Sequence, residues 1–133
     1  MSFTCTTDLS AYLGQSVDDG AGNFPGECVS IVKKFCAPAM PPTKQWRRGA
    51  KVQGKKDVRG GTAIATFQTN GRFKSRDGHA AIFVDQDDKG ITVWDQFNHP
   101  KKGVGTRYLP FKNSKDVTDG NDGSNFYIIE VEP

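Results

Sequence analysis

The sequence predicts an α+β domain in which one helix packs across one face of an antiparallel sheet. The strongest helical pattern starts near residue 28, and the segments with strand character all follow residue 61. Helices that precede a run of strands are typical of the α+β class. With 133 residues the chain can bury a sizeable core, and we predict one domain over residues 1–133.

Composition and charge describe an ordinary folded protein with a mild excess of cations. The chain is 35% hydrophobic and 25% charged, and its net charge is +3. This charge suits an anionic polymer as a partner but does not by itself indicate nucleic acid. No window is apolar enough for insertion into a membrane, and the N-terminus lacks the basic and apolar regions of an ordinary secretory signal.

Helices and their connections are expected in the first half of the chain. Residues 9–13 predict a short helix and residues 15–24 a loop. Apolar residues spaced three and four apart predict a second helix that begins at Cys28 and is stopped by Pro38. Residues 43–61 carry seven cations and one carboxylate, so we expect a long polar loop there. A nucleic-acid patch would need interleaved aromatic residues, so nucleic acid is not a predicted partner.

Five later segments have strand character, because each is short, apolar or alternating, and bounded by glycine or charged turns. These segments are 62–67, 80–84, 90–96, 107–111 and 126–131. The pattern is weakest over 107–111, and residues 98–105 are expected to form a polar loop. Together the segments predict the sheet that the helix covers.

Cys28 is the candidate nucleophile. It falls in the first turn of the predicted helix, where free backbone N–H groups and the positive end of the helix dipole favour an anion. The thiolate is the reactive form of cysteine. Cys28 also lies on an apolar stripe, where cysteines are ordinarily core residues, so the helix alone favours the core interpretation. Cys36, at the far end of the stripe, is expected to be structural and could pair with Cys5 in an oxidising compartment.

A predicted hairpin supplies a base for that thiol. Residues two apart on a strand share a face, so His79 and Asp95 each lie with the apolar residues of their strands. The register that joins these apolar sets pairs Val84 with Gly90 and places His79 directly opposite Asp95. Two ionisable groups on an apolar face are costly to bury unless they pair. Paired, and covered by the first turn of the helix, they would give Cys28 a base and its orienting carboxylate.

Other assignments stay open on the residues alone. Gln96 or Asn98 could orient the imidazole instead, although Gln96 would face it only in a slipped register. Taken singly, each hairpin residue is more simply an ordinary rim histidine or a strand-end carboxylate. His99 is expected in an exposed loop, and a zinc site that combines it with Cys28 and the hairpin pair matches no metal-binding spacing. No metal and no cofactor are therefore predicted.

Four motifs follow one another in a fixed order. They are Gly26-Glu27-Cys28 at a helix start, Gly61-Thr62-Ala63 and Gly78-His79-Ala80 at strand starts, and Val93-Trp94-Asp95 within a strand. This order resembles the papain-like peptidoglycan amidases, and within them the CHAP and NlpC-type group. The resemblance runs from Gly26 to Gln96. One departure is the glycine before the 62–67 segment, where the family commonly has aspartate.

The resemblance implies a papain-like fold and a cysteine amidase that cleaves peptidoglycan stem or cross-link peptides. Cys28 would attack the carbonyl and form a thioester, His79 would move the proton, and Asp95 would fix the imidazole tautomer. The small size and the missing signal peptide also look like amidase effectors delivered by type VI secretion. We therefore expect a bacteriolytic effector that leaves the cytoplasm by a non-Sec route, acts in the periplasm or on the cell wall, and has a cognate immunity protein.

Two other functions stay open beside this expectation. A thiol protease or acyltransferase that acts on proteins would use the same cysteine and histidine. A non-enzymatic binding module would instead keep Cys28 as a core residue.

Overall fold

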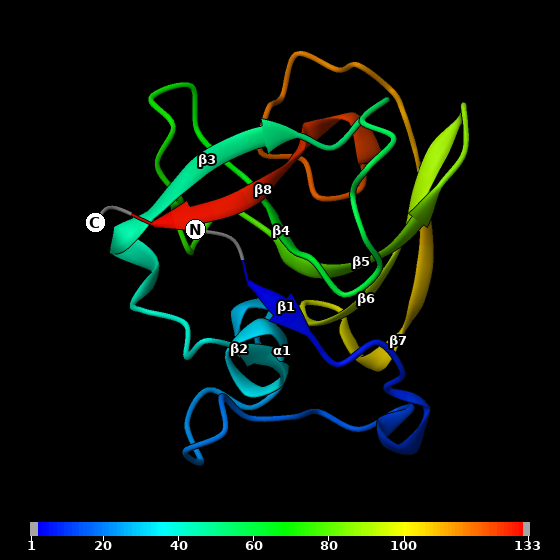
Figure 1. The fold of residues 1–133 in the computed structure, drawn as a ribbon. Coiled ribbons are helices and arrows are strands. Elements are labelled where there is room, and N and C mark those ends of the chain that lie inside the picture. Colours follow the sequence, from blue (N-terminus) through cyan, green and yellow to red (C-terminus); the bar gives the residue numbers. More distant parts are fainter. Residues whose placement is uncertain (1–2, 132–133) are drawn as a thin grey trace.

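The computed structural model describes residues 3–131, and its main feature is a six-stranded antiparallel sheet with one α-helix against it (Figure 1). The helix is α1 (Cys28–Phe35), and the strands are β1 (Thr4–Cys5), β2 (Cys36–Ala37), β3 (Trp46–Lys51), β4 (Ala63–Thr66), β5 (Ala80–Gln86), β6 (Gly90–Asn98), β7 (Lys101–Pro110) and β8 (Phe126–Val131). Short 3-10 helices occupy Ser10–Tyr12, Thr43–Gln45 and Gly123–Asn125. This architecture confirms the predicted α+β class and the helix on one face of an antiparallel sheet.

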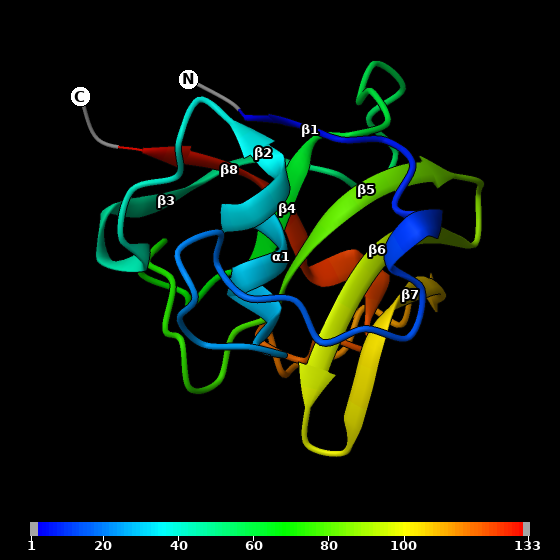
Figure 2. The same cartoon turned by 90° about the horizontal axis from the view of Figure 1, so that it is seen from below.

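The large sheet has the strand order β3-β8-β4-β5-β6-β7, and α1 crosses one of its faces (Figure 2). Ile31 and Val32 of α1 are fully buried in a cluster that includes Ile82 of β5. A second apolar cluster, which includes Phe83 and Phe126, lies on the other face. Apolar residues therefore alternate between two cores along β5, as strand geometry requires. Within the described residues, no helix has the length and apolarity to cross a membrane.

Helix α1 is tied to the N-terminal segment at its C-terminal end. Cys36, predicted to extend the helix stripe, is the first residue of β2 and pairs with Cys5 of β1. The two cysteines form a disulfide, and Cys28 is the free cysteine of the chain. The pairing that the sequence left open is thus present, and it leaves one thiol available for chemistry.

The prediction of a loop over residues 43–61 is wrong, because β3 lies within it as an edge strand paired with β8. Trp46 at its start is fully buried, packs on Phe73 at a ring-centroid distance of 4.9 Å, and donates its indole N–H to the carbonyl of Pro41. The rest of the strand carries cations and glycine, so the alternating apolar pattern of a strand is missing. Tertiary pairing with β8 overrides that weak local pattern.

The prediction of a loop over residues 98–105 is also wrong. Strands β6 and β7 continue to Asn98 and Lys101, so His99 and Pro100 form a tight turn between them. Cross-strand pairing extends strands whose own residues are polar, as happens here on both sides of the turn. His99 is exposed, as expected.

Candidate active site

Cys28 is the first residue of α1, and its side chain is 9% exposed. Gly26, with φ of +81°, turns the chain into the helix in a conformation that favours glycine. A Cβ at Gly26 would collide with Asn98, whose Nδ2 donates to the carbonyl of Pro25 and to Oε1 of Glu27 at 3.3 and 3.2 Å. The thiol therefore sits at a tightly packed helix start.

Gln96 ties this helix start to β6. Its Nε2 donates to the carbonyls of Val17 and Glu27, and its Oε1 accepts from the N–H of Val17, each at 2.9 Å. The side chain is fully buried and its polar atoms are all engaged. Gln96 and Asn98, the two alternative partners of the imidazole, thus both bind the helix start instead.

His79 meets Asp95, as the sequence predicted. Nε2 of His79 lies 2.8 Å from Oδ2 of Asp95, which is completely buried. Because Nε2 is engaged with the carboxylate, Nδ1 is the ring nitrogen left for a thiol. Sγ of Cys28 lies 4.0 Å from the carbonyl oxygen of Gly78, the residue before His79, and the interaction with Cys28 contributes to the raised pKa of His79.

The predicted register of the hairpin is wrong. Phe83 pairs with Val93, and an irregularity follows before Asp85 pairs with Thr92, so Val84 does not pair with Gly90. Near the turn the pairing is displaced by three residues from the predicted register, and the bulge, which inserts one extra residue in β5, reduces this displacement to two residues near the site. A shift by two residues keeps every side chain on its face, so the His79–Asp95 contact survives as a diagonal rather than a direct pair.

The prediction that the first helical turn covers the His79 face is wrong as well. Helix α1 packs on Ala80, Ile82 and Trp94, whereas Ala81 and Phe83 belong to the cluster on the opposite face. Cys28 instead lies close to the residues that precede β5, with its Sγ 4.0 Å from the carbonyl oxygen of Gly78.

Arg107 of β7 is part of the site and was missed by sequence reasoning. Its Nε and Nη2 both donate to Oδ2 of Asp95, at 2.9 and 2.6 Å, and its Nη1 donates to Oδ1 of Asn121 at 2.9 Å. The guanidinium also lies over the ring of Phe97, 4.9 Å from its centroid. Arg107 pairs with Val93 and so shares a face with Asp95, which the two-residue period would have indicated once β6 and β7 were known to pair.

These contacts set the charge states of the pair. Burial alone raises the pKa of Asp95, but hydrogen bonds from His79 and Arg107, with their positive charges, outweigh burial and hold the pKa below its ordinary value. Burial alone lowers the pKa of His79, but hydrogen bonds and charge interactions with Asp95 and Cys28 raise it to about 9. At neutral pH these contacts therefore favour an imidazolium beside the ionised carboxylate of Asp95.

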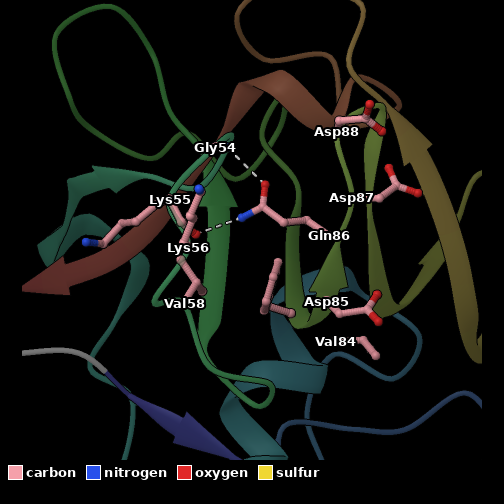
Figure 3. Close-up of a pocket in the computed structure, with 10 residues that line it drawn as sticks. Gly54, Lys55, Lys56, Val58, Val84, Asp85, Gln86, Asp87 and Asp88 are labelled. Carbon is pink, nitrogen blue, oxygen red and sulfur yellow. Dashed lines mark hydrogen bonds between the residues drawn. The ribbon is translucent and has the colours of Figure 1, made fainter.

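Two cavities flank this centre. One of about 680 Å³ lies beside Cys28, and one of about 380 Å³ lies beside His79 and includes His99 and Asn121 in its lining. A third cavity of about 490 Å³ opens at the far end of β5, where the Gln86 side chain binds the loop at Gly54 (Figure 3). Its lining holds cations and carboxylates but neither histidine nor cysteine. In the part of the chain that the structure describes, no three His, Cys, Asp or Glu side chains are grouped to hold a metal ion.

Comparisons of the sequence and of the fold with known proteins identify similar proteins of one family. A family model described as domesticated amidase effector 2 matches residues 1–129. The chain is 34% identical over 115 residues to a type VI secretion amidase effector 2 protein of Salmonella typhi, covering 78% of this chain and 84% of that protein. It is 37% identical over 107 residues to domesticated amidase effector 2 of Ixodes scapularis, covering 79% of this chain and 71% of that protein. A solved structure of a type 6 secretion amidase effector 2 superposes with a TM-score of 0.74 at 30% identity, over 97% of this chain and 95% of the other.

Proposed function

Because this chain belongs to the domesticated amidase effector 2 family, we propose that it is a peptidoglycan amidase whose nucleophile is the thiol of Cys28. The observation that carries the proposal is that Sγ of Cys28, at the start of α1, lies 4.0 Å from the carbonyl oxygen of Gly78, next to a His79 whose Nε2 is held by Asp95. The interaction with Cys28 also raises the pKa of His79. A thiol, a base and an orienting carboxylate are the groups that nucleophilic acyl transfer requires.

The reaction starts from the thiolate of Cys28 and the imidazolium of His79. The sulfur attacks the carbonyl carbon of a peptide amide, and the oxyanion accepts a hydrogen bond from the backbone N–H of Cys28 in the first helical turn. Nδ1 of His79 then gives its proton to the leaving amine, the C–N bond breaks, and a thioester remains. Water, deprotonated by the now neutral His79, attacks the thioester and releases the acid and the thiolate.

Asp95 acts on the imidazole rather than on the substrate. Its Oδ2 holds the Nε2–H of His79, which keeps Nδ1 directed to the sulfur and stabilises the charged ring. Cys28 begins a helix that packs on an antiparallel sheet, and His79 directly precedes strand β5 of that sheet. This arrangement supports a papain-like assignment of the CHAP and NlpC type.

The family also supports a biological role. We infer that the protein is a bacteriolytic effector delivered by type VI secretion, a route that needs no secretory signal, to the periplasm of a target cell. A producer of such an enzyme requires protection, so a cognate immunity protein that blocks the Cys28–His79 cleft is the expected partner.

The test is digestion of purified sacculi followed by mass spectrometry of the released muropeptides. Wild-type protein should release peptides with new amine and carboxylate ends. Both Cys28→Ala and His79→Ala should release none, although their melting curves show cooperative unfolding of a folded protein. Asp95→Ala should retain a reduced rate, because Asp95 orients and does not react. Cleavage of sacculi by Cys28→Ala would refute the proposed role of Cys28 as nucleophile. Cleavage of casein but not of sacculi by the wild-type protein would indicate a protease of the same chemistry.

A further inference from the structure

The charges of this protein are strongly segregated along the chain. Residues 33–76 contain 12 of the 18 lysines and arginines but only one of the 15 aspartates and glutamates, Asp57. The rest of the chain is therefore net acidic, although the whole protein is only mildly basic. Part of this basic segment lies directly at the candidate active site.

The cavity beside Cys28 takes its cations from that segment. Lys33 of α1 lines it from one side, and Lys74 and Arg76 line it from the loop before β5. Glu27 is the one carboxylate among its lining residues. Cys28 itself lines the same cavity, so a ligand bound there contacts the thiol.

These cations have little internal compensation. Among the described residues, neither Lys33 nor Arg76 takes part in an ion pair or a side-chain hydrogen bond. Lys74 pairs with Asp77 at 3.4 Å, but both side chains are about half exposed, and such pairs contribute little. The carboxylate of Glu27 accepts a hydrogen bond from Asn98. With three cations against the one carboxylate of Glu27, the lining carries a net positive charge next to the nucleophile, although the charge of Lys33 also acts on Asp19.

The cavity on the other side of the imidazole differs. Its cation is Arg107, whose guanidinium is already bound to Asp95, and Asp77 also lines it. Positive charge that is free to meet a ligand is therefore concentrated on the Cys28 side of the cleft.

We propose that the cavity lined by Lys33, Lys74 and Arg76 binds a free carboxylate of the substrate peptide, on one side of the amide that Cys28 attacks. The inference rests on the proposed amidase function and specifies its substrate. Wall peptides carry carboxylates that are not consumed in their peptide bonds, and charge-assisted hydrogen bonds from lysine and arginine are the contacts that select such groups. The enzyme should then discriminate against wall peptides in which that carboxylate is amidated.

The test compares the variant Lys33→Gln/Lys74→Gln/Arg76→Gln with wild type on purified cross-linked muropeptides, with each free carboxylate present or amidated in turn. A control, Lys56→Gln/Arg59→Gln/Lys89→Gln, removes the same charge from exposed positions at the far end of β5. The triple cavity variant should raise KM for the free-carboxylate substrate by about tenfold or more, with a much smaller change in kcat. Amidation of one particular carboxylate should raise the wild-type KM to a similar degree, which identifies the group that is bound.

Three results would overturn the inference. The first is a cavity variant whose KM equals that of the control at low and at high salt, which would mean that the cavity cations act only through general electrostatic attraction. Wild type could cleave every amidated substrate as well as the free one, which would leave the amidase intact but without a carboxylate subsite. Failure of wild type to cleave any muropeptide would instead remove the proposed function, and the subsite with it.

Discussion

Arg107 forms a buried ion pair with Asp95 in which both Nε and Nη2 donate to one carboxylate oxygen, Oδ2, at 2.9 and 2.6 Å. The same oxygen meets Nε2 of His79 at 2.8 Å. The position of the imidazole, at the start of β5, therefore depends on a cation of β7, two strands away in the sheet. Asp95 is the shared partner through which a change in Arg107 reaches His79.

Removal of that cation should weaken both stability and activity. Arg107→Gln leaves the buried carboxylate with the imidazole and with Lys102, whose Nζ is 4.0 Å from Oδ1, so we expect the free energy of unfolding to fall by about 3 kcal/mol. The rate of cleavage should fall more than KM rises, because orientation of His79 is lost. Chemical denaturation and muropeptide kinetics measure the two effects. Arg59→Gln, an exposed control, should change neither, and an unaltered Arg107→Gln enzyme would contradict the role of the ion pair.

Gln96 should matter to the nucleophile rather than to the base. Gln96→Leu fills a similar volume but removes three hydrogen bonds and takes away the partner of the buried Val17 N–H, whereas the carbonyls of Val17 and Glu27 still accept from the N–H groups of Gly26 and Ser30. We expect a loss of about 2 kcal/mol in stability and a fall in kcat. The NMR chemical shifts of the His79 ring should change little in Gln96→Leu, whereas they should change clearly in Arg107→Gln. A normal kcat in a destabilised Gln96→Leu protein would limit its role to stability.

Gly120 leaves room for the imidazole. A Cβ added there would lie 2.7 Å from Cβ and 2.9 Å from Cγ of His79, closer than real side-chain contacts. Gly120→Ala should therefore displace His79 and reduce cleavage by at least about tenfold, as expected when a catalytic group moves by an ångström. Wall digestion together with a melting curve measures this. Full activity at an unchanged melting temperature would mean that the loop moves instead of the histidine.

The charge on His79 should persist well above neutral pH. Its pKa is raised from 6.5 to about 9, so the folded protein keeps a proton that the unfolded chain loses. The resulting stabilisation is complete below pH 6.5 and is lost as pH rises through about 9. NMR titration of labelled histidine in the Cys28→Ser and wild-type proteins measures the pKa directly. Asp95→Asn should lower it, and a His79 that is neutral at pH 7 in wild type would contradict this account.

Local patterns were sufficient for the helix of Cys28 and for the His79–Asp95 contact. The apolar stripe after Gly26 specifies one helix start, and a period of two places the ionisable pair on one face whatever even shift the register takes. With the one-residue bulge in β5, the net displacement of the register near the site is two residues, which does not exchange faces, so an incorrect register still led to the right contact.

Features that depend on tertiary pairing could not be predicted in this way. Strand β3 has one buried apolar residue, Trp46, and is formed by pairing with β8. Arg107 is a cation in a weakly patterned segment, and its contact with Asp95 follows from the β6–β7 register, which the predicted loop over residues 98–105 concealed. The face of the sheet that α1 covers could not be predicted either, because it depends on how the helix packs on β5 and β6 and not on the local pattern of either strand.

The central claim is that Cys28 is a nucleophile activated by His79, and timed alkylation of the native protein tests it most directly. Intact-mass measurement with iodoacetamide at pH 7 should show one rapid modification, at Cys28, since Cys5 and Cys36 form a disulfide. His79→Gln keeps a hydrogen-bond donor without the charge and should slow the modification by at least about tenfold. A Cys28 that resists the reagent until the protein unfolds, or that reacts equally fast in His79→Gln, would contradict the claim.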